Sequence, residues 1–176
     1  MLFVKLDTCA YQDLKKVGAY RYTRDGDFEI RVITYAFDNG DIIQATTEEE
    51  KKEAVKLIGG LKHKKVVCGA EFVRCALTTC AENIYHTTII DLLKLSAALG
   101  LPHRLSSLAR TLSLPVPPSL TYTKTPFAEM TEEERAKLLE HNRGRLDLMR
   151  KCFNNLTDQM RLITSKEIDL MHATER

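Results

Sequence analysis

The sequence has no tryptophan, no long uninterrupted hydrophobic run and almost no net charge. Lys94 and His103 interrupt its most hydrophobic region, which excludes a helix that spans a bilayer. The 26 basic and 24 acidic residues leave a net charge of +2, so bulk electrostatics favour no class of partner. Lys5 follows the first apolar residues instead of preceding them, unlike the basic start of a signal peptide. We therefore expect the 176 residues to form one compact domain in the cytoplasm, without a membrane partner.

The sequence also lacks the short motifs that most often identify a ligand. Neither G-x-G-x-x-G nor G-x4-G-K-[ST] occurs, which removes the glycine-rich loops that cradle nucleotide phosphates. No C-x2-C pair occurs among the five cysteines, and their odd number favours free thiols in a reducing compartment. The one candidate zinc set is Cys68, Cys75, Cys80 and His86, but Cys75 and Cys80 would lie about 140° apart on a helix. We favour small buried thiols, with no metal.

Alternating hydrophobicity and turn residues predict the strands. Residues 29–37 alternate and are rich in β-formers, and the turn at residues 38–41 leads into residues 42–45 as a hairpin. Gly18 and residues 25–27 mark turns. Further strands are expected at residues 2–6, 65–68 and 84–90.

Capping boxes predict where two of the helices begin. Thr47 and Thr131 each precede a run of three glutamates, the last of which lies three residues on from the threonine. The second of these helices contains Gly144, where we expect a bend, and Ser165 is expected to cap a final short helix. Helices are expected at residues 47–60, 70–80, 91–99, 106–112 and 131–156. This order of elements predicts an α/β fold with a mixed sheet flanked by helices.

Several segments resemble one known family. In order along the chain they are residues 13–22 (DLKKVGAYRY), 33–40 (ITYAFDNG), 68–72 (CGAEF), 91–93 (DLL) with 99–102 (LGLP), and 105–112 (LSSLARTL). These strings resemble the DnaQ-like 3′–5′ exonuclease domain of phage- and prophage-type family A DNA polymerases. The resemblance covers most of residues 3–157 and implies an RNase H-like fold. It places the domain at residues 1–157 and leaves residues 158–176 as a C-terminal tail with a short helix.

The same resemblance locates the expected metal site, where its enzymes hold two divalent metals with four carboxylates. The first motif, D-x-E, falls at Lys5 and Asp7, and the acid of the second falls at Val73. The third motif falls at His141, an acceptable water-orienting residue, and at Arg145, which replaces the last aspartate. Only Asp7 of the four carboxylates remains, so these positions sum to +1 instead of −4. We expect no catalytic residues, no Mg²⁺ or Mn²⁺, and a nuclease fold without nuclease activity.

A rearranged metal site is the first alternative. It would use Asp7, Glu71, Asp91 and Asp147 to bind Mg²⁺ or Mn²⁺ and would make the chain an active 3′–5′ exonuclease. Glu71 and Asp147 are each two residues from the expected positions, which on a helix is a rotation of about 200°, so both should point away.

The altered site itself has two interpretations. Lys5, Asp7 and Arg145 can form a local ion-pair network, which we favour, or Lys5, His141 and Arg145 can hold a phosphate without cutting it. Basic residues near tyrosines extend the second interpretation, as on surfaces that bind single strands. The candidate nucleic-acid-binding residues are Lys5, Arg145, His141, Lys15, Lys16 and Arg21.

The replacement of the expected metal-binding carboxylates leads us to expect a protein that binds its partner without catalysis. We expect an accessory protein of a phage or prophage, in the cytoplasm of a bacterial host, that binds nucleic acid or a host replication or defence protein. A third interpretation is an interaction or homodimerisation module that uses the tail. Its apolar residues are Ile163, Ile168, Leu170 and Met171.

Overall fold

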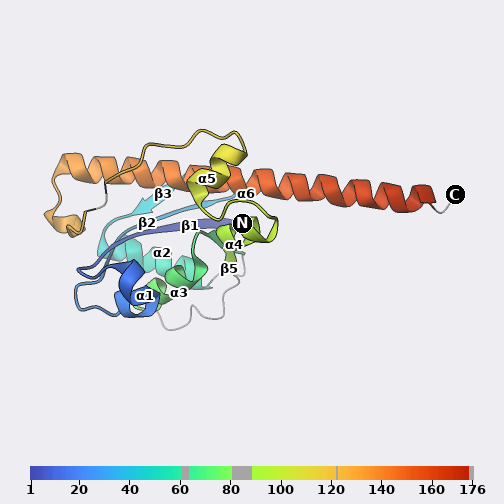
Figure 1. The fold of residues 1–176 in the computed structure, drawn as a ribbon. Helices are drawn as coiled ribbons and strands as arrows, with labels where there is room; N and C mark the ends of the chain where they lie inside the picture. The colour runs from blue at the N-terminus through green and yellow to red at the C-terminus, as the bar shows by residue number, and fades with distance from the viewer. Residues whose placement is uncertain (61–63, 81–88, 122, 175–176) are drawn as a thin grey trace.

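The chain folds around one five-stranded sheet (Figure 1). The computed structural model describes residues 1–60, 64–80, 89–121 and 123–174. The strands are β1 (Leu2–Cys9), β2 (Glu29–Phe37), β3 (Ile43–Ala45), β4 (Lys65–Val67) and β5 (Ile89–Asp91). The helices are α1 (Leu14–Tyr22), α2 (Glu48–Gly60), α3 (Ala70–Leu77), α4 (Leu92–Ala98), α5 (Leu105–Thr111) and α6 (Glu132–Thr174), with a short 3₁₀ helix at Phe127–Glu129.

The sheet is mixed, as predicted. Its strand order is β3-β2-β1-β4-β5, with β1 antiparallel to β2, β2 antiparallel to β3, and β4 parallel to both β1 and β5. Strand β1 therefore lies at the centre of the sheet. A register shift between Asp7 and Thr8 interrupts its pairing with β2, which continues at Thr8 and Cys9.

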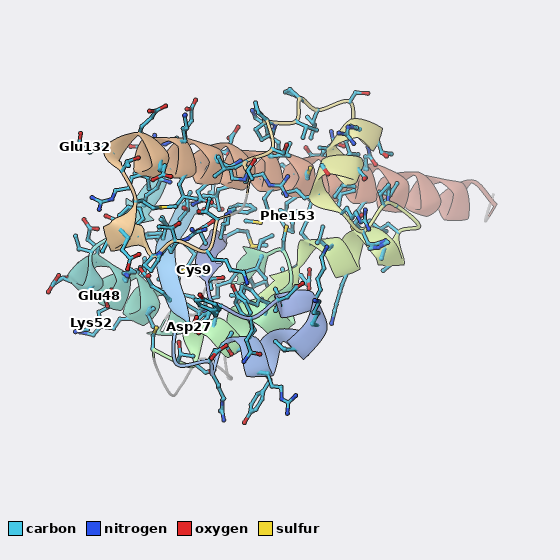
Figure 2. All side chains as sticks on the ribbon, turned by 60° about the vertical axis from the view of Figure 1, so that its left-hand side comes forward. Cys9, Asp27, Glu48, Lys52, Glu132 and Phe153 are labelled. Carbon is cyan, nitrogen blue, oxygen red and sulfur yellow. The ribbon has the colours of Figure 1, made fainter. Side chains whose placement is uncertain are left out.

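Helices cover both faces of the sheet and bury two main core clusters. Leu2 and Val4 of β1 pack against α2 and α3 on one face. Phe3 faces the other way, toward α4, α5 and α6, and meets Phe153 edge to face at 5.6 Å between ring centroids. Figure 2 shows Phe153 among the side chains between α6 and the sheet. Because successive strand residues point to opposite faces, Lys5 and Asp7 lie on the α6 face with Phe3.

Most expected elements are present, and both capping boxes are confirmed. The Thr47 Oγ accepts from the Glu50 amide at 3.3 Å, and the Glu50 carboxylate accepts from the Thr47 amide at 3.0 Å. Thr131 and Glu134 make the same pair of bonds at the start of α6. Of the strand expected at residues 84–90, Ile89 and Ile90 belong to β5, and residues 84–88 lie outside the described part of the chain.

Two expectations about helices are wrong. Residues 14–22 form α1, where only a turn at Gly18 is expected, because Asp13 caps the segment and accepts from the Lys15 amide at 3.0 Å. Gly18 interrupts this helix with a φ of 78°. Helix α6 does not end near Leu156 to give a separate helix capped by Ser165 but continues to Thr174, since no glycine or proline follows Gly144 to stop it.

Gly144 has a different role from the expected bend. Helix α6 continues through it, and a Cβ built on Gly144 would lie 3.4 Å from the Cβ of Pro117. Gly144 therefore lies where the proline-rich connector at residues 113–126 passes close to α6, and a Cβ there would be in ordinary contact with Pro117.

The C-terminal half of α6 runs past the rest of the chain (Figure 1). The last of its described core residues is Leu156. The tail side chains named above, at positions 163, 168, 170 and 171, lie outside the described side chains. In the described ranges, no helix combines the length and the hydrophobicity that a membrane span requires.

Candidate functional site

Four of the five expected site positions meet around β1. Lys5 of β1 and Arg145 of α6 line an open cleft of about 650 Å³ and also a smaller cavity of about 140 Å³ behind it. His141, one helical turn before Arg145, lines the cleft, and Val73 of α3 lines the smaller cavity. The fold therefore brings these four positions together, although they lie on three elements far apart in sequence.

Lys5 occupies the position of the first expected aspartate. Its Nζ donates to the Oδ1 of Asn142, a residue of α6 that is fully buried. The pKa of Lys5 is lowered to about 8, chiefly by burial; the charge of Asp7 opposes the shift, and the positive charges of Arg145 and Arg31 contribute to it. At neutral pH the Lys5 side chain is therefore a cation, and its hydrogen bond to Asn142 holds it in place where it lines the cleft.

Asp7 is engaged in a buried ion pair. Its Oδ1 accepts from the Nε of Arg31 at 2.6 Å, and the Arg31 side chain is only 1% exposed. The same guanidinium donates to the carbonyl oxygens of Thr123 and Thr125, each at 3.1 Å. The carboxylate thus already has a cationic partner in the fold, which leaves it a poor metal ligand.

His141 is held neutral at pH 7 by its surroundings. Burial and the charge of Lys5 lower its pKa, and a hydrogen bond to the Pro118 carbonyl oxygen opposes this shift. The Nδ1 lies 3.2 Å from that oxygen and must donate to it, which leaves Nε2 as an acceptor in the neutral ring.

Arg145 is the cation with the most freedom to bind a ligand. It makes no hydrogen bond or ion pair with any residue in the described part of the chain. Arg110 and Ser106 of α5 line the same cleft, and no carboxylate is among the described residues that line it. A fork of five N–H donors without an internal partner suits a phosphate or carboxylate ligand.

Sequence reasoning missed Arg110, Arg31 and Asn142 as parts of this region. One signal was present: residues 92–128, which form α4, α5 and the connector, contain no aspartate or glutamate. A long span without acids in a chain of balanced charge indicates one electropositive surface.

The candidates on α1 do not join the cleft. Lys15 lines a separate depression of about 550 Å³ that it shares with Asp7 and Lys124, and the exposed Lys16 and Arg21 line neither hollow. The aromatic residues expected beside them separate as well. Tyr20 is 59% exposed, whereas Tyr22 is buried in the core.

The alternative carboxylate set does not converge. Asp91 accepts from three backbone amides, those of Gly69, Ala70 and Leu93, and so fixes the turn between β4 and α3. Asp147 pairs with Arg150 and Lys151, and Glu71 is exposed on α3. Within the described ranges no three acidic, histidine or cysteine side chains are grouped to hold a metal ion. The residues present do not fit a two-metal centre.

The candidate zinc ligands offer no better site. Cys68, Cys75 and Cys80 are free thiols, and His86 lies outside the described residues. Burial raises the pKa of the Cys68 thiol to about 12, which opposes formation of the thiolate that zinc binds.

Comparison with known proteins supports the fold and goes no further. No family model and no curated protein matches the chain. Among solved structures, Brucella melitensis NrnC with bound Mg²⁺ is 15% identical with a TM-score of 0.51, covering 99% of this chain and 87% of that one. A second Brucella melitensis NrnC structure is 15% identical with a TM-score of 0.54, covering 97% and 85%. The chain thus shares the fold of these structures and has the expected α/β architecture, a mixed sheet flanked by helices.

Proposed function

We propose that this chain binds nucleic acid in the cleft formed by Lys5, Arg110, His141 and Arg145 and does not hydrolyse it. The observation that carries the proposal is the charge at the expected metal site. Lys5 and Arg145 replace two of the four carboxylates, Val73 replaces a third, and Asp7 is neutralised by Arg31.

The chemistry of the cleft supports binding over cleavage. Two divalent cations need several anionic oxygens, and none of the side chains that line this cleft supplies one. Arg145 and Arg110 can each donate two hydrogen bonds to one phosphate, and Lys5 adds a point charge. Positive charge that in a nuclease comes from metals is here part of the protein, without a metal-bound water to attack the phosphate.

The proposed biological setting follows from the resemblance to phage- and prophage-type polymerase exonuclease domains. We place the chain as an accessory protein of such an element that acts on nucleic acid by binding. The basic cleft favours nucleic acid over a host protein as its partner, because the ligand must bring several anionic oxygens.

One assay tests binding and cleavage together. Labelled single-stranded DNA and RNA are incubated with the full chain in Mg²⁺, Mn²⁺ or EDTA. We expect retention without shortening in all three conditions, and weaker retention by Arg145→Met. The matched control is Arg143→Met, at an exposed arginine on the same helix that does not line the cleft.

Two outcomes contradict the proposal. Metal-dependent shortening from the 3′ end, abolished by Asp7→Ala, would identify an active exonuclease with a rearranged site. Neither retention nor shortening would direct attention to a protein partner.

A further inference from the structure

Provided that the proposed function holds, features of the cleft indicate which phosphate group of a nucleic acid it binds. We infer that it recognises a terminal phosphate monoester, so that the chain binds nucleic-acid ends that carry a phosphate in preference to hydroxyl ends or internal backbone.

The charge of the cleft favours a monoester over a diester. Lys5, Arg110 and Arg145 give the cleft three cations, and its described lining has no carboxylate to offset them. An internal phosphodiester carries one negative charge, whereas a monoester has a second ionisation near pH 6 and is mostly a dianion at neutral pH. The dianion compensates more of the charge that burial makes costly at Lys5.

The shape of the cleft favours the end of a strand. Lys5 and Arg145 lie where the open cleft meets the smaller cavity of about 140 Å³. Most of the side chains around that inner cavity are apolar: Val4, Leu6, Phe72, Val73, Leu105 and Met149. A continuous backbone cannot run on through this apolar inner cavity, because its charged phosphates would lose their hydration there. A terminal group needs only the open side.

The number of hydrogen-bond donors around the cleft also favours a monoester. A monoester presents three terminal oxygens and an internal diester two. Two guanidinium groups, the Lys5 ammonium and the Ser106 hydroxyl surround the same cleft and together offer more donors than a diester can accept.

Lys5 is also held ready for such a group. Its ammonium is fixed by the Oδ1 of the fully buried Asn142, and the Nδ2 of Asn142 has no hydrogen-bond partner among the described residues. An orphaned buried amide costs free energy, and its place beside Lys5 is explained if the amide serves to position the ammonium. A cation positioned in advance loses little entropy when the phosphate binds.

The test compares DNA strands of one sequence that differ only at their ends. Fluorescence anisotropy in EDTA gives the affinity of the full chain for strands with a 3′-phosphate, a 5′-phosphate or two hydroxyl ends, and an unlabelled circular strand competes against them. We expect one of the two phosphate ends to bind about tenfold tighter than the hydroxyl-ended strand. Which of the two gains affinity identifies the end that enters the cleft.

Variants assign the gain to the cleft. Arg145→Met and Arg110→Met should each remove most of the preference for the phosphate end, and Arg143→Met should keep it. Arg110 is exposed, so its variant remains informative if Arg145→Met fails to fold. Equal affinity for phosphate ends, hydroxyl ends and the circle would overturn the inference and leave the proposed function standing. Failure to bind any of these strands would overturn both.

Discussion

Arg31 and Asp7 form a buried ion pair at the expected metal site. The guanidinium lies inside the fold and donates to Asp7 and to two carbonyl oxygens of the connector, those of Thr123 and Thr125. The Arg31 side chain is thus a fixed cation that pairs with Asp7, the one carboxylate at the expected metal site. The pair is specific in geometry, and each partner depends on the other to offset the cost of burial.

Breaking this pair from one side should be costly. Asp7→Asn leaves the buried Arg31 without its counter-charge, and we expect the free energy of unfolding to fall by about 3–5 kcal/mol. Urea unfolding measures the change, with Asp41→Asn, at an exposed carboxylate, as the control within about 0.5 kcal/mol of the parent chain. The double variant Asp7→Leu with Arg31→Met should cost less than the sum of the two single changes. An unchanged stability in Asp7→Asn would show that Arg31 does not need the carboxylate.

Lys5 predicts a pH dependence of stability with a definite sign. Its pKa is about 8 in the folded chain and 10.5 in the unfolded one, so the cost of burying its charge is complete below pH 8. Between pH 8 and 10.5 the unfolded chain binds more protons, and stability rises by about 2–3 kcal/mol from this group. Lys5→Met lacks the effect, so its stability relative to the parent chain should decline as the pH rises through that window. Urea unfolding at several pH values tests this, with Lys52→Met as the exposed reference, and a constant difference would contradict it.

At the scale of elements, the contact between α6 and the connector shapes the cleft. Pro117 packs beside Gly144, and the next residue, Pro118, accepts from His141 one turn earlier on α6. The wall of the cleft is therefore held to the helix by one close approach and one hydrogen bond. The size of the side chain at position 144 should therefore determine whether that wall can stay in place.

Two substitutions at this position should act in opposite ways. Gly144→Ala adds a Cβ in ordinary contact with Pro117 and improves helix propensity, so we expect about 1 kcal/mol of added stability in urea unfolding and unchanged binding. Gly144→Leu adds bulk that the connector must move to accommodate, and we expect weaker binding of single-stranded DNA in fluorescence anisotropy. Equal binding by both variants would show that the connector does not shape the ligand site.

The same elements show how far sequence reasoning reaches. The hairpin of β2 and β3 and the starts of α2 and α6 were predictable because alternation, turn residues and capping boxes act over a few neighbouring residues. The segment at residues 14–22 has no apolar periodicity to mark a helix, since only Tyr22 is buried in it. The end of α6 was missed because no local stop signal exists beyond Gly144.

The site was predictable in position and less so in chemistry. The resemblance placed Lys5, Val73, His141 and Arg145, and the structure brings them together. Arg31 escaped notice because a charged residue in a strand pattern usually faces water, and only the fold shows that both faces of β2 are covered there. Arg110 comes from a different helix, which spacing along the chain does not reveal.

At the scale of the whole molecule, the distribution of charge matters more than its sum. The net charge is only +2, yet residues 92–128 carry no acid, and they form the helices and the connector on the cleft side of the sheet. Binding should therefore depend on a small local set of cations and not on a broad basic surface.

The salt dependence of binding measures the size of that set. With three cations in contact with phosphates, a plot of log Kd for single-stranded DNA against log salt concentration should have a slope of about 2. The Arg145→Met variant should lower this slope by about 0.7. Arg143→Met should leave the slope unchanged. Anisotropy titrations between roughly 50 and 300 mM salt give these values. A slope of about 5 or more would mean that a much larger surface contacts the strand.

Helix α6 fixes the distance between the cleft and the C-terminal end of the helix. His141 and Arg145 lie in its first half, and its backbone continues unbroken to Thr174, past the rest of the chain (Figure 1). At 1.5 Å per residue, the helix end lies about 40 Å along the axis from Arg145. Whatever is joined to that end is carried at a set spacing and on a set side of the ligand held in the cleft.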